Sequence, residues 1–504
     1  MYREKIILAL AASFLLVTSI LRADSGTWLA NPVDNNWNNP ANWSSGTVPS
    51  IHDTATLAFS TITSLSIHDF SAVDEMFFPS GASAYTFVLH LPMYFSFYLT
   101  GIVNESGVTQ NFLLTARSGG MEQGVIIFDY GTTAGTNTAF TCEAATTNDG
   151  AQGSIQFEQS SAGSGTYHNL GATISGGVGG RTDFYYNGCS AENSTIINDG
   201  ATADGATGGG TAFQQAKPSA GNATLIANGG TDGGGGGSFV FADASLGGTA
   251  RLEVFGNGYA DLSRHIGPSF TIGSIEGDGV IYVGRTTFLV GSNSLSTIFS
   301  GVLHPGGPGG HGNGSGALVK IGDGSLTLTG ANLYKAGTTV SAGALMIDNA
   351  IGSGTGPGEV RVNGGMLGGR GIISGAVTIG GTGVLAPAVG ARQATLTIQS
   401  ALTINAHAAY ACTFRAAGSQ AIADEVVANG VTINSGATFV FSGTAQGTLT
   451  QGLVLTVISN TAATPISGTF SNLPDGAILT VNGNNFQASY EGGDGNDLTL
   501  TVVM

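Results

Sequence analysis

A phenylalanine returns at a nearly constant interval through the middle of this 504-residue chain. Successive members are 29, 27, 29 and 28 residues apart, and short apolar runs separated by glycine clusters lie between them. A period of roughly 20 to 50 residues is typical of solenoids and propellers, in which each repeat packs only on its neighbours. The members are Phe128, Phe157, Phe184, Phe213 and Phe241.

Within each period the apolar residues alternate with polar ones, as in Ser154-Ile155-Gln156-Phe157, which predicts half-buried strands. Turn sequences rich in Asn and Gly accompany the strands, for example at residues 148–150, 198–200 and 228–230. Phenylalanines that return once per turn would stack inside a parallel coil, because neighbouring strands lie about 4.8 Å apart. A sandwich would more often place longer strands at about 8–12-residue spacing. The pattern therefore predicts an all-β parallel β-helix with about 25 residues per turn.

The composition agrees with β structure and limits the partners. The chain holds 82 glycines, which disfavour helices by about 1 kcal/mol each relative to alanine. Hydrophobic residues make up 42%, too many for a disordered chain. With only 9% charged residues and a net charge of −17, nucleic acid and anionic lipid are disfavoured as partners. Extracellular polysaccharide or cell-surface components remain as expected partners.

The N-terminus has the features of an export signal. Arg3 and Lys5 precede the apolar stretch 6–20, and Ala23 offers a small residue at the expected cleavage point. The apolar stretch is shorter than the about 20 residues that a spanning helix needs. We therefore expect a signal peptide, a secreted or cell-surface protein, and no transmembrane span after the signal is removed.

Composition and repeats divide the chain into six expected segments. The Gly/Pro/His-rich stretch in the middle separates two repetitive blocks. The segments are 1–23 (signal peptide), 24–123 (N-terminal cap and first turns), 124–301 (β-helix with repeats of about 28 residues), 302–314 (loop), 315–423 (second block of β-strand repeats) and 424–504 (C-terminal β segment).

All the tryptophans, Trp28, Trp37 and Trp43, lie in one short segment after the signal. Indole rings stack on sugar faces, which makes these residues ligand candidates if they are exposed. They also suit a cap, because the open end of a β-helix exposes unpaired backbone groups that large aromatic side chains cover. Terminal repeats of solenoids are usually atypical, which favours the cap.

Three cysteines, Cys142, Cys189 and Cys412, are too few for a disulfide scaffold in an exported chain of this length. A bridge between Cys142 and Cys189 stays open, and an odd count leaves at least one free thiol. The sequence does not decide between these states.

Residues 316–345 read G-x-L-x-K-x-G-x-G-x-L-T-L-x-G-x-N-x-Y followed by G-T-T-V-x-x-G-x-L, and this stretch resembles the autotransporter-associated β-strand repeat family. Segments 37–59, 219–230, 424–436 and 467–474 also resemble parts of such proteins. The resemblance implies an exported, right-handed β-helical stalk with a structural or adhesive role and without catalytic residues. The sequence ends at Met504 with no room for the membrane barrel of a full autotransporter, so we expect a passenger-like chain.

Two motifs suggest a metal ion without establishing one. The run 492–497, which contains Asp494 and Asp497, fits one copy of the G-G-x-G-x-D calcium repeat. Calcium needs six to eight oxygen ligands, so a single copy also suits a tight turn before the last strand. His304 and His311 flank a Pro/Gly run, but no third ligand is evident. We expect no cofactor, with calcium as a weak alternative.

A polysaccharide lyase is the catalytic alternative. Such a β-helix uses a basic residue to abstract a proton beside carboxylates. One group of charged residues is denser than the others. If the protein is structural, this group is a solvated face of the coil; if the protein is a lyase, the group is the cleavage site. Its members are Arg251, Glu253, Asp261, Arg264 and His265. We favour a structural or adhesive protein that is not an enzyme.

Overall fold

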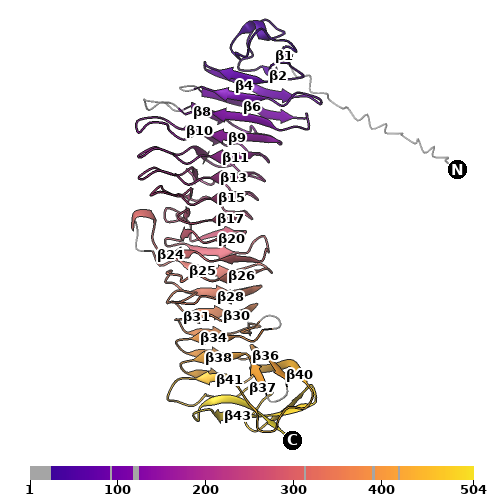
Figure 1. Cartoon of the computed structure of the whole chain (residues 1–504), viewed down its shortest axis with the longest axis vertical. Helices are drawn as coiled ribbons and strands as arrows, with labels where there is room; N and C mark the ends of the chain where they lie inside the picture. Colours follow the sequence, from indigo (N-terminus) through magenta and orange to yellow (C-terminus); the bar gives the residue numbers. More distant parts are fainter. Residues whose placement is uncertain (1–23, 91–93, 117–123, 311–313, 389–391, 418–419) are drawn as a thin grey trace, which may run out of the picture.

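The computed structural model describes residues 24–90, 94–116, 124–310, 314–388, 392–417 and 420–504. The expected signal peptide, residues 1–23, lies outside the described residues. The chain forms one elongated stack of short strands that runs from the N-terminal to the C-terminal end (Figure 1). Neighbouring strands pair in parallel through most of the stack, which confirms the parallel β-helix. Two 3-10 turns, η1 (Pro40–Asn42) and η2 (Pro308–Gly310), are the helical elements of the described part.

Four sheets form the walls of the coil. The N-terminal sheet has 12 parallel strands. They are β1 (Asp24–Thr27), β2 (Thr54–Thr56), β4 (Ser71–Phe78), β6 (Tyr94–Asn104), β8 (Gly124–Phe128), β10 (Gly153–Glu158), β12 (Arg181–Tyr185), β14 (Gly210–Gln214), β16 (Ser238–Phe241), β18 (Tyr259–Asp261), β21 (Val280–Tyr282) and β24 (Val302–His304).

The long sheet runs through almost the whole stack, and its strands are parallel except for β37. They are β3 (Ser64–Ile67), β5 (Thr86–Leu89), β7 (Gln110–Leu114), β9 (Thr138–Cys142), β11 (Thr166–Asn169), β13 (Thr195–Asn198), β15 (Thr224–Ala227), β17 (Arg251–Val254), β20 (Ser274–Gly277), β23 (Thr297–Phe299), β26 (Ser325–Leu328), β28 (Ala344–Ile347), β30 (Met366–Gly369), β33 (Val384–Leu385), β36 (Ala409–Ala417), β37 (Gln420–Ala423) and β40 (Thr438–Gln446).

Two further sheets complete the C-terminal half. The middle sheet comprises β19 (Ser269–Ile272), β22 (Thr287–Val290), β25 (Ala317–Lys320), β27 (Thr338–Val340), β29 (Val360–Val362), β32 (Val377–Ile379), β35 (Leu402–Ile404) and β39 (Val431–Ile433). The C-terminal sheet comprises β31 (Ile372–Ile373), β34 (Thr395–Ile398), β38 (Glu425–Ala428), β41 (Val454–Asn460), β44 (Asp497–Val503), β43 (Asn484–Gly492) and β42 (Ile478–Val481). Its last three strands are antiparallel and close the end of the stack.

The phenylalanine repeat is one column of the core, as predicted. Each ring lies directly above the next in the N-terminal sheet, because the strands pair in register at these positions. From Phe128 to Phe241 the ring centroids are 4.7 to 5.1 Å apart and the planes within 11° of parallel. A second column, which starts at Phe87 and ends at Tyr167, stacks on the long sheet. The coil spacing therefore sets the sequence period.

A column of seven of the 82 glycines has a steric explanation. It lies at the corner where the chain leaves the long sheet and enters the N-terminal sheet. A Cβ atom built on Gly209 would come within 2.1 Å of the Asn169 carbonyl oxygen in the turn before. At the equivalent residue of successive turns, a backbone carbonyl oxygen of the preceding turn would likewise lie 1.9 to 2.7 Å from the added Cβ. A side chain at these positions would therefore push neighbouring turns apart. The members are Gly153, Gly180, Gly209, Gly237, Gly258, Gly279 and Gly301.

The two repetitive blocks share one continuous coil. The long sheet pairs strand by strand across residues 302–314, and one hydrophobic cluster extends from Trp28 to Val502. The turn length is not constant, however. Eleven residues separate β13 from β14, four separate β17 from β18, and two separate β20 from β21. The repeat of about 28 residues therefore ends near β17 rather than at residue 301, because the corner loop shortens.

Side-chain amides join sections of wall that lack regular strands. The amide of Asn332 accepts a hydrogen bond from the Leu303 N–H at 2.8 Å and donates one to the Gly354 carbonyl at 2.7 Å. It thereby continues the hydrogen bonding where the N-terminal sheet stops. At the C-terminal end, Asn472 binds both the N–H and the C=O of Phe439 on the last strand of the long sheet. These amides satisfy strand edges that are otherwise open to pairing.

Candidate functional site

The tryptophan segment is packed against the first turns of the coil. All three indole rings are at most 2% exposed. Trp43 makes edge-to-face contacts with Trp28 and Trp37, at centroid distances of 5.3 and 4.7 Å. The indole N–H groups of Trp28 and Trp43 donate to backbone carbonyls. Protein therefore covers the ring faces that sugar stacking requires, and the three candidates occupy the position of a cap.

The cysteines are buried and free. Cys142, Cys189 and Cys412 each lie in the core without a disulfide partner, so the structure does not contain the Cys142–Cys189 bridge. Burial raises the pKa of all three thiols, which keeps them protonated at neutral pH.

The charged set considered for lyase chemistry does not converge. Arg251 lies on the long sheet and binds both carboxylate oxygens of Glu276, at 2.6 and 2.7 Å, with Glu253 beside them. Asp261 lies on the N-terminal sheet, where it accepts the Ser263 N–H. His265 Nε2 lies 3.1 Å from the Ser245 carbonyl, and Arg264 is exposed. The five residues are divided between walls of the coil and do not line one groove.

The two metal motifs have local structural roles in the part of the chain that is described. Asp494 is exposed in the turn between β43 and β44, and Asp497 accepts the Asn460 N–H at 2.8 Å. His304 accepts the Gly306 N–H, whereas His311 lies outside the described residues. Among the described residues, no three His, Cys, Asp or Glu side chains are grouped to hold a metal ion.

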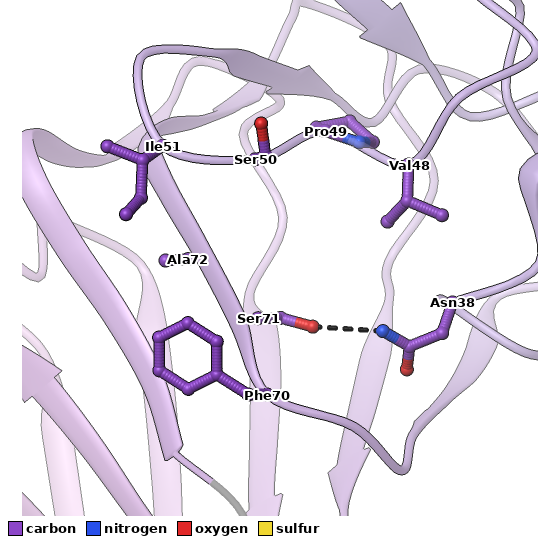
Figure 2. Close-up of a pocket in the computed structure, with 8 residues that line it drawn as sticks. All are labelled: Asn38, Val48, Pro49, Ser50, Ile51, Phe70, Ser71 and Ala72. Atoms are coloured by element: carbon purple, nitrogen blue, oxygen red, sulfur yellow. Dashed lines mark hydrogen bonds between the residues drawn. The ribbon is translucent and has the colours of Figure 1, made fainter.

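A depression of about 400 Å³ lies beside the cap (Figure 2). Its exposed walls are the side chains of Phe70 and Ile51, which are 56% and 43% exposed. Its polar side chains are already engaged. Asn38 donates to Ser71 at 3.1 Å, and Ser50 donates to Asp53. The depression therefore offers an apolar wall without a polar side chain free to orient a ligand.

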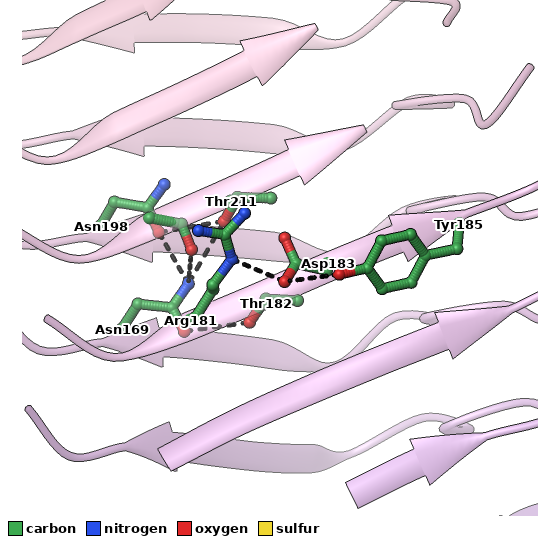
Figure 3. Close-up of polar contacts among 8 residues, drawn as sticks. Asn169, Arg181, Thr182, Asp183, Tyr185, Asn198 and Thr211 are labelled. Carbon is green, nitrogen blue, oxygen red and sulfur yellow. Dashed lines mark hydrogen bonds and ion pairs between the residues drawn. The ribbon is translucent and has the colours of Figure 1, made fainter. Parts of the chain in front are cut away.

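A polar cluster on the outer face of the N-terminal sheet is the stronger candidate. Arg181, Asp183 and Tyr185 alternate along β12 with the inward-facing Thr182 and Phe184, so their side chains lie on the outer face of the sheet. Figure 3 shows Arg181 and Tyr185 on either side of Asp183. Strand register places Gln156 and Glu158 beside them on β10 and Gln214 on β14. We call these residues the Arg181–Asp183 cluster: Gln156, Glu158, Arg181, Asp183, Tyr185 and Gln214.

Asp183 is the centre of the cluster. Its Oδ2 atom accepts hydrogen bonds from Arg181 Nε at 2.6 Å and from the Tyr185 hydroxyl at 3.2 Å. These two side chains cover the carboxylate, which is only 2% exposed although it faces outward. Its other oxygen, Oδ1, is buried without a hydrogen-bond partner, and so is the hydroxyl of Ser154. Ser154 lies beside Arg181 on the neighbouring strand.

Burial controls the electrostatics of the cluster. Removal from water raises the pKa of Asp183, and the adjacent Arg181 opposes this shift. Burial also raises the pKa of Glu158, with the negative charge of Asp129 adding to the effect. The cluster thus combines one aromatic ring, carboxylates, amides and a guanidinium group. Such a set can bind hydroxyl groups from several directions.

A buried amide pair supports β12 from inside the coil. The side-chain amide of Asn169 donates to Asn198 Oδ1 at 2.7 Å, and the Thr182 hydroxyl donates to Asn169 Oδ1 at 3.0 Å (Figure 3). Thr182 lies between Arg181 and Asp183 in sequence, so the inner network fixes the strand that carries the cluster. Sequence reasoning missed the cluster. The available signal was an Arg and an Asp two residues apart within a strand of a charge-poor chain.

The structure explains why the repeat at residues 316–345 contains a lysine, Lys320. Lys320 is 1% exposed, and its ammonium group donates to the carbonyls of Ile321, Gly322 and Ala342. Burial lowers the pKa of Lys320 to about 8, and the nearby Asp323 opposes the shift. Tyr334 in the same repeat is buried and hydrogen-bonded to Thr338. The residues that define the repeat therefore build the coil and its corners.

Comparison with known proteins confirms the resemblance seen in this repeat. Residues 318–347 match the passenger-associated-transport-repeat family. A stretch of 122 residues is 37% identical to the adhesin BmaC autotransporter of Brucella suis biovar 1 (strain 1330). The match covers 23% of this chain and 3% of that protein, so the chain corresponds to a small part of its relative. Over the described residues, the structure holds no helix with the length and apolar character needed to cross a membrane.

Proposed function

We propose that this chain, an autotransporter passenger-like repeat protein, is a secreted or surface-displayed adhesive stalk without catalytic activity. In this proposal residues 1–23 direct export, and the described residues form the stalk. Adhesion is the role named for the relative that shares 37% identity over 122 residues.

The observation that carries the proposal is the unbroken long sheet from β3 to β40. Each turn is hydrogen-bonded to the next, and the core has no break between the two repetitive blocks. A coil of this kind is stiff along its axis and presents long lateral faces, which suits a spacer that holds binding groups away from a surface. Its covered ends also disfavour end-to-end aggregation.

Adhesion is tested with beads coated with the purified protein, residues 24–504. The beads are applied under flow to surfaces coated with neutral polysaccharide, acidic polysaccharide, collagen or fibronectin, and albumin-coated beads serve as the control. We expect retention on at least one surface above the albumin control, and no shortening of the polysaccharides. Equal retention of both kinds of bead on every surface would reject adhesion, and cleavage of a polysaccharide would reject the non-catalytic account.

A further inference from the structure

We infer that the Arg181–Asp183 cluster is a binding site for a neutral saccharide unit, which is the ligand of the adhesive function proposed above. The site lies on a lateral face, where a polymer can approach the coil without entering it.

The outer face at the cluster holds buried polar atoms without hydrogen-bond partners. Asp183 Oδ1 and Ser154 Oγ are buried without partners, and their residues lie on adjacent strands of the same outer face. A buried acceptor without a partner costs about 1–3 kcal/mol, so each one in a folded protein needs an explanation. Ligand hydroxyls that reach these atoms supply the missing hydrogen bonds.

The cover over Asp183 can be displaced by side-chain motion alone. It consists of side chains from the same strand, because Arg181 and Tyr185 fold over the carboxylate from either side. The Arg181 side chain is 43% exposed, so it has room to move. A rotation of Arg181 or Tyr185 opens Asp183 without any change in the backbone. The backbone itself is fixed by the buried amide network behind β12.

The chemistry of the cluster selects the class of ligand. A carboxylate and the amides of Gln156 and Gln214 bind hydroxyl groups, and an aromatic ring such as Tyr185 offers a face for the apolar side of a sugar. Arg181 is paired with Asp183 at 2.6 Å, so its charge is largely neutralised. Glu158 and the net charge of −17 disfavour an anionic ligand. A neutral sugar therefore fits better than a uronate or a phosphate.

The test measures binding of defined sugars to the purified protein by calorimetry. The probes are maltohexaose, cellohexaose, laminarihexaose and mannohexaose, with hexagalacturonic acid as the anionic comparison. We expect at least one neutral hexaose to bind more tightly than the acidic one. Tyr185→Ala and Asp183→Asn should each weaken that binding by about tenfold, the loss of about 1.4 kcal/mol that one hydrogen bond or ring contact contributes.

Controls separate the site from folding and from adhesion itself. Tyr130→Ala removes an exposed tyrosine outside the cluster and should leave binding unchanged. Tyr185→Phe keeps the aromatic ring and removes only the hydroxyl group, so it disturbs folding less than Tyr185→Ala does. Thermal unfolding of each variant checks that a loss of binding is not a loss of folding. Binding of no neutral hexaose, or full binding by both Tyr185→Ala and Asp183→Asn, would overturn the site. If beads coated with the Tyr185→Ala variant adhere as well as beads coated with the unaltered protein, the adhesive function is supported and the role of this site in it is rejected. If the sugars bind but beads coated with the unaltered protein do not adhere, the saccharide site is supported and the adhesive function is rejected.

Discussion

The rings of Phe184 and Phe213 lie parallel with their centroids 4.7 Å apart, although the two residues are 29 positions apart in sequence. This contact exists because one full turn of the coil separates them. Phe213→Ala opens a cavity in a column that has a ring on either side, and we expect a loss of about 3–5 kcal/mol in the free energy of unfolding. Denaturant titration measures the change. Phe59→Ala, at a phenylalanine that is 64% exposed, serves as the control with little effect.

The glycine column can be tested with two neighbouring residues. Gly209→Ala brings a Cβ within 2.1 Å of a backbone carbonyl of the preceding turn, whereas Gly210→Ala meets only the Ser238 hydroxyl at 3.5 Å. We expect Gly209→Ala to cost about 1–3 kcal/mol and Gly210→Ala to be close to neutral. Thermal unfolding of the two variants measures the difference. Equal stabilities would show that the column is not sterically required.

Asn332 should behave as a buried structural amide. Asn332→Ala leaves the Leu303 N–H and the Gly354 carbonyl without partners, and we expect a loss of about 2–4 kcal/mol. Asn363→Ala, at an exposed asparagine, is the matched control. Hydrogen exchange at the Leu303 amide provides a second readout, because exchange there should accelerate only in the Asn332 variant.

The buried Lys320 predicts a specific pH dependence. Its pKa is about 8 in the folded protein and near the usual 10.5 when unfolded. Between these values the unfolded chain binds the proton more strongly, so this group makes the protein more stable as pH rises from about 8 to about 10.5. The cost of burying the charged form is present in full below pH 8.

The measurement compares the protein with its Lys320→Met variant from pH 7 to pH 10. The difference in unfolding free energy should shift in favour of the unaltered protein as pH increases. The same comparison with Lys335→Met, at an exposed lysine of the same repeat, should show no such trend. A Lys320 difference that stays constant over this range contradicts the burial of its ammonium group.

The number of thiol groups that react with a reagent shows whether the cysteines are free or in a disulfide. Cys142, Cys189 and Cys412 are buried and free, so a thiol reagent should react slowly with the folded protein. After denaturation without reductant, three thiols per chain should react. A count of one would instead show that one disulfide, such as Cys142–Cys189, had formed.

The sequence predicted the parts of the fold that repeat. The phenylalanine period works because every turn must place a side chain at the same point of the core, as between Phe184 and Phe213. Turn length was harder to predict. The corner loops lie outside the main core and the parallel phenylalanine column ends at Phe241, so this column does not report that the loops shorten after β17. Continuity across residues 302–314 depends on strand pairing, which sequence alone does not reveal.

The candidate site was not predicted, and the reason is physical. Arg181, Asp183 and Tyr185 form an ordinary outward-facing alternation in the sequence, and only the structure shows that Asp183 is buried beneath its neighbours. The tryptophans drew attention because indoles bind sugars, yet edge-to-face packing between Trp37 and Trp43 covers them. Composition distinguishes neither an exposed ring from a buried one nor a satisfied carboxylate from an unsatisfied one.

Continuity of the coil is the central claim, and distances between spin labels on the long sheet test it most directly. Labels replace Thr195 on β13, Ser325 on β26 and Ala409 on β36, which lie in one outward-facing column of the sheet. At about 4.8 Å per strand, the account predicts roughly 24 Å from Thr195 to Ser325 and roughly 43 Å from Thr195 to Ala409, both with narrow distributions. Broad distributions, or a distance to Ala409 that departs from this spacing, would show that the two blocks are separate bodies and would contradict the single coil.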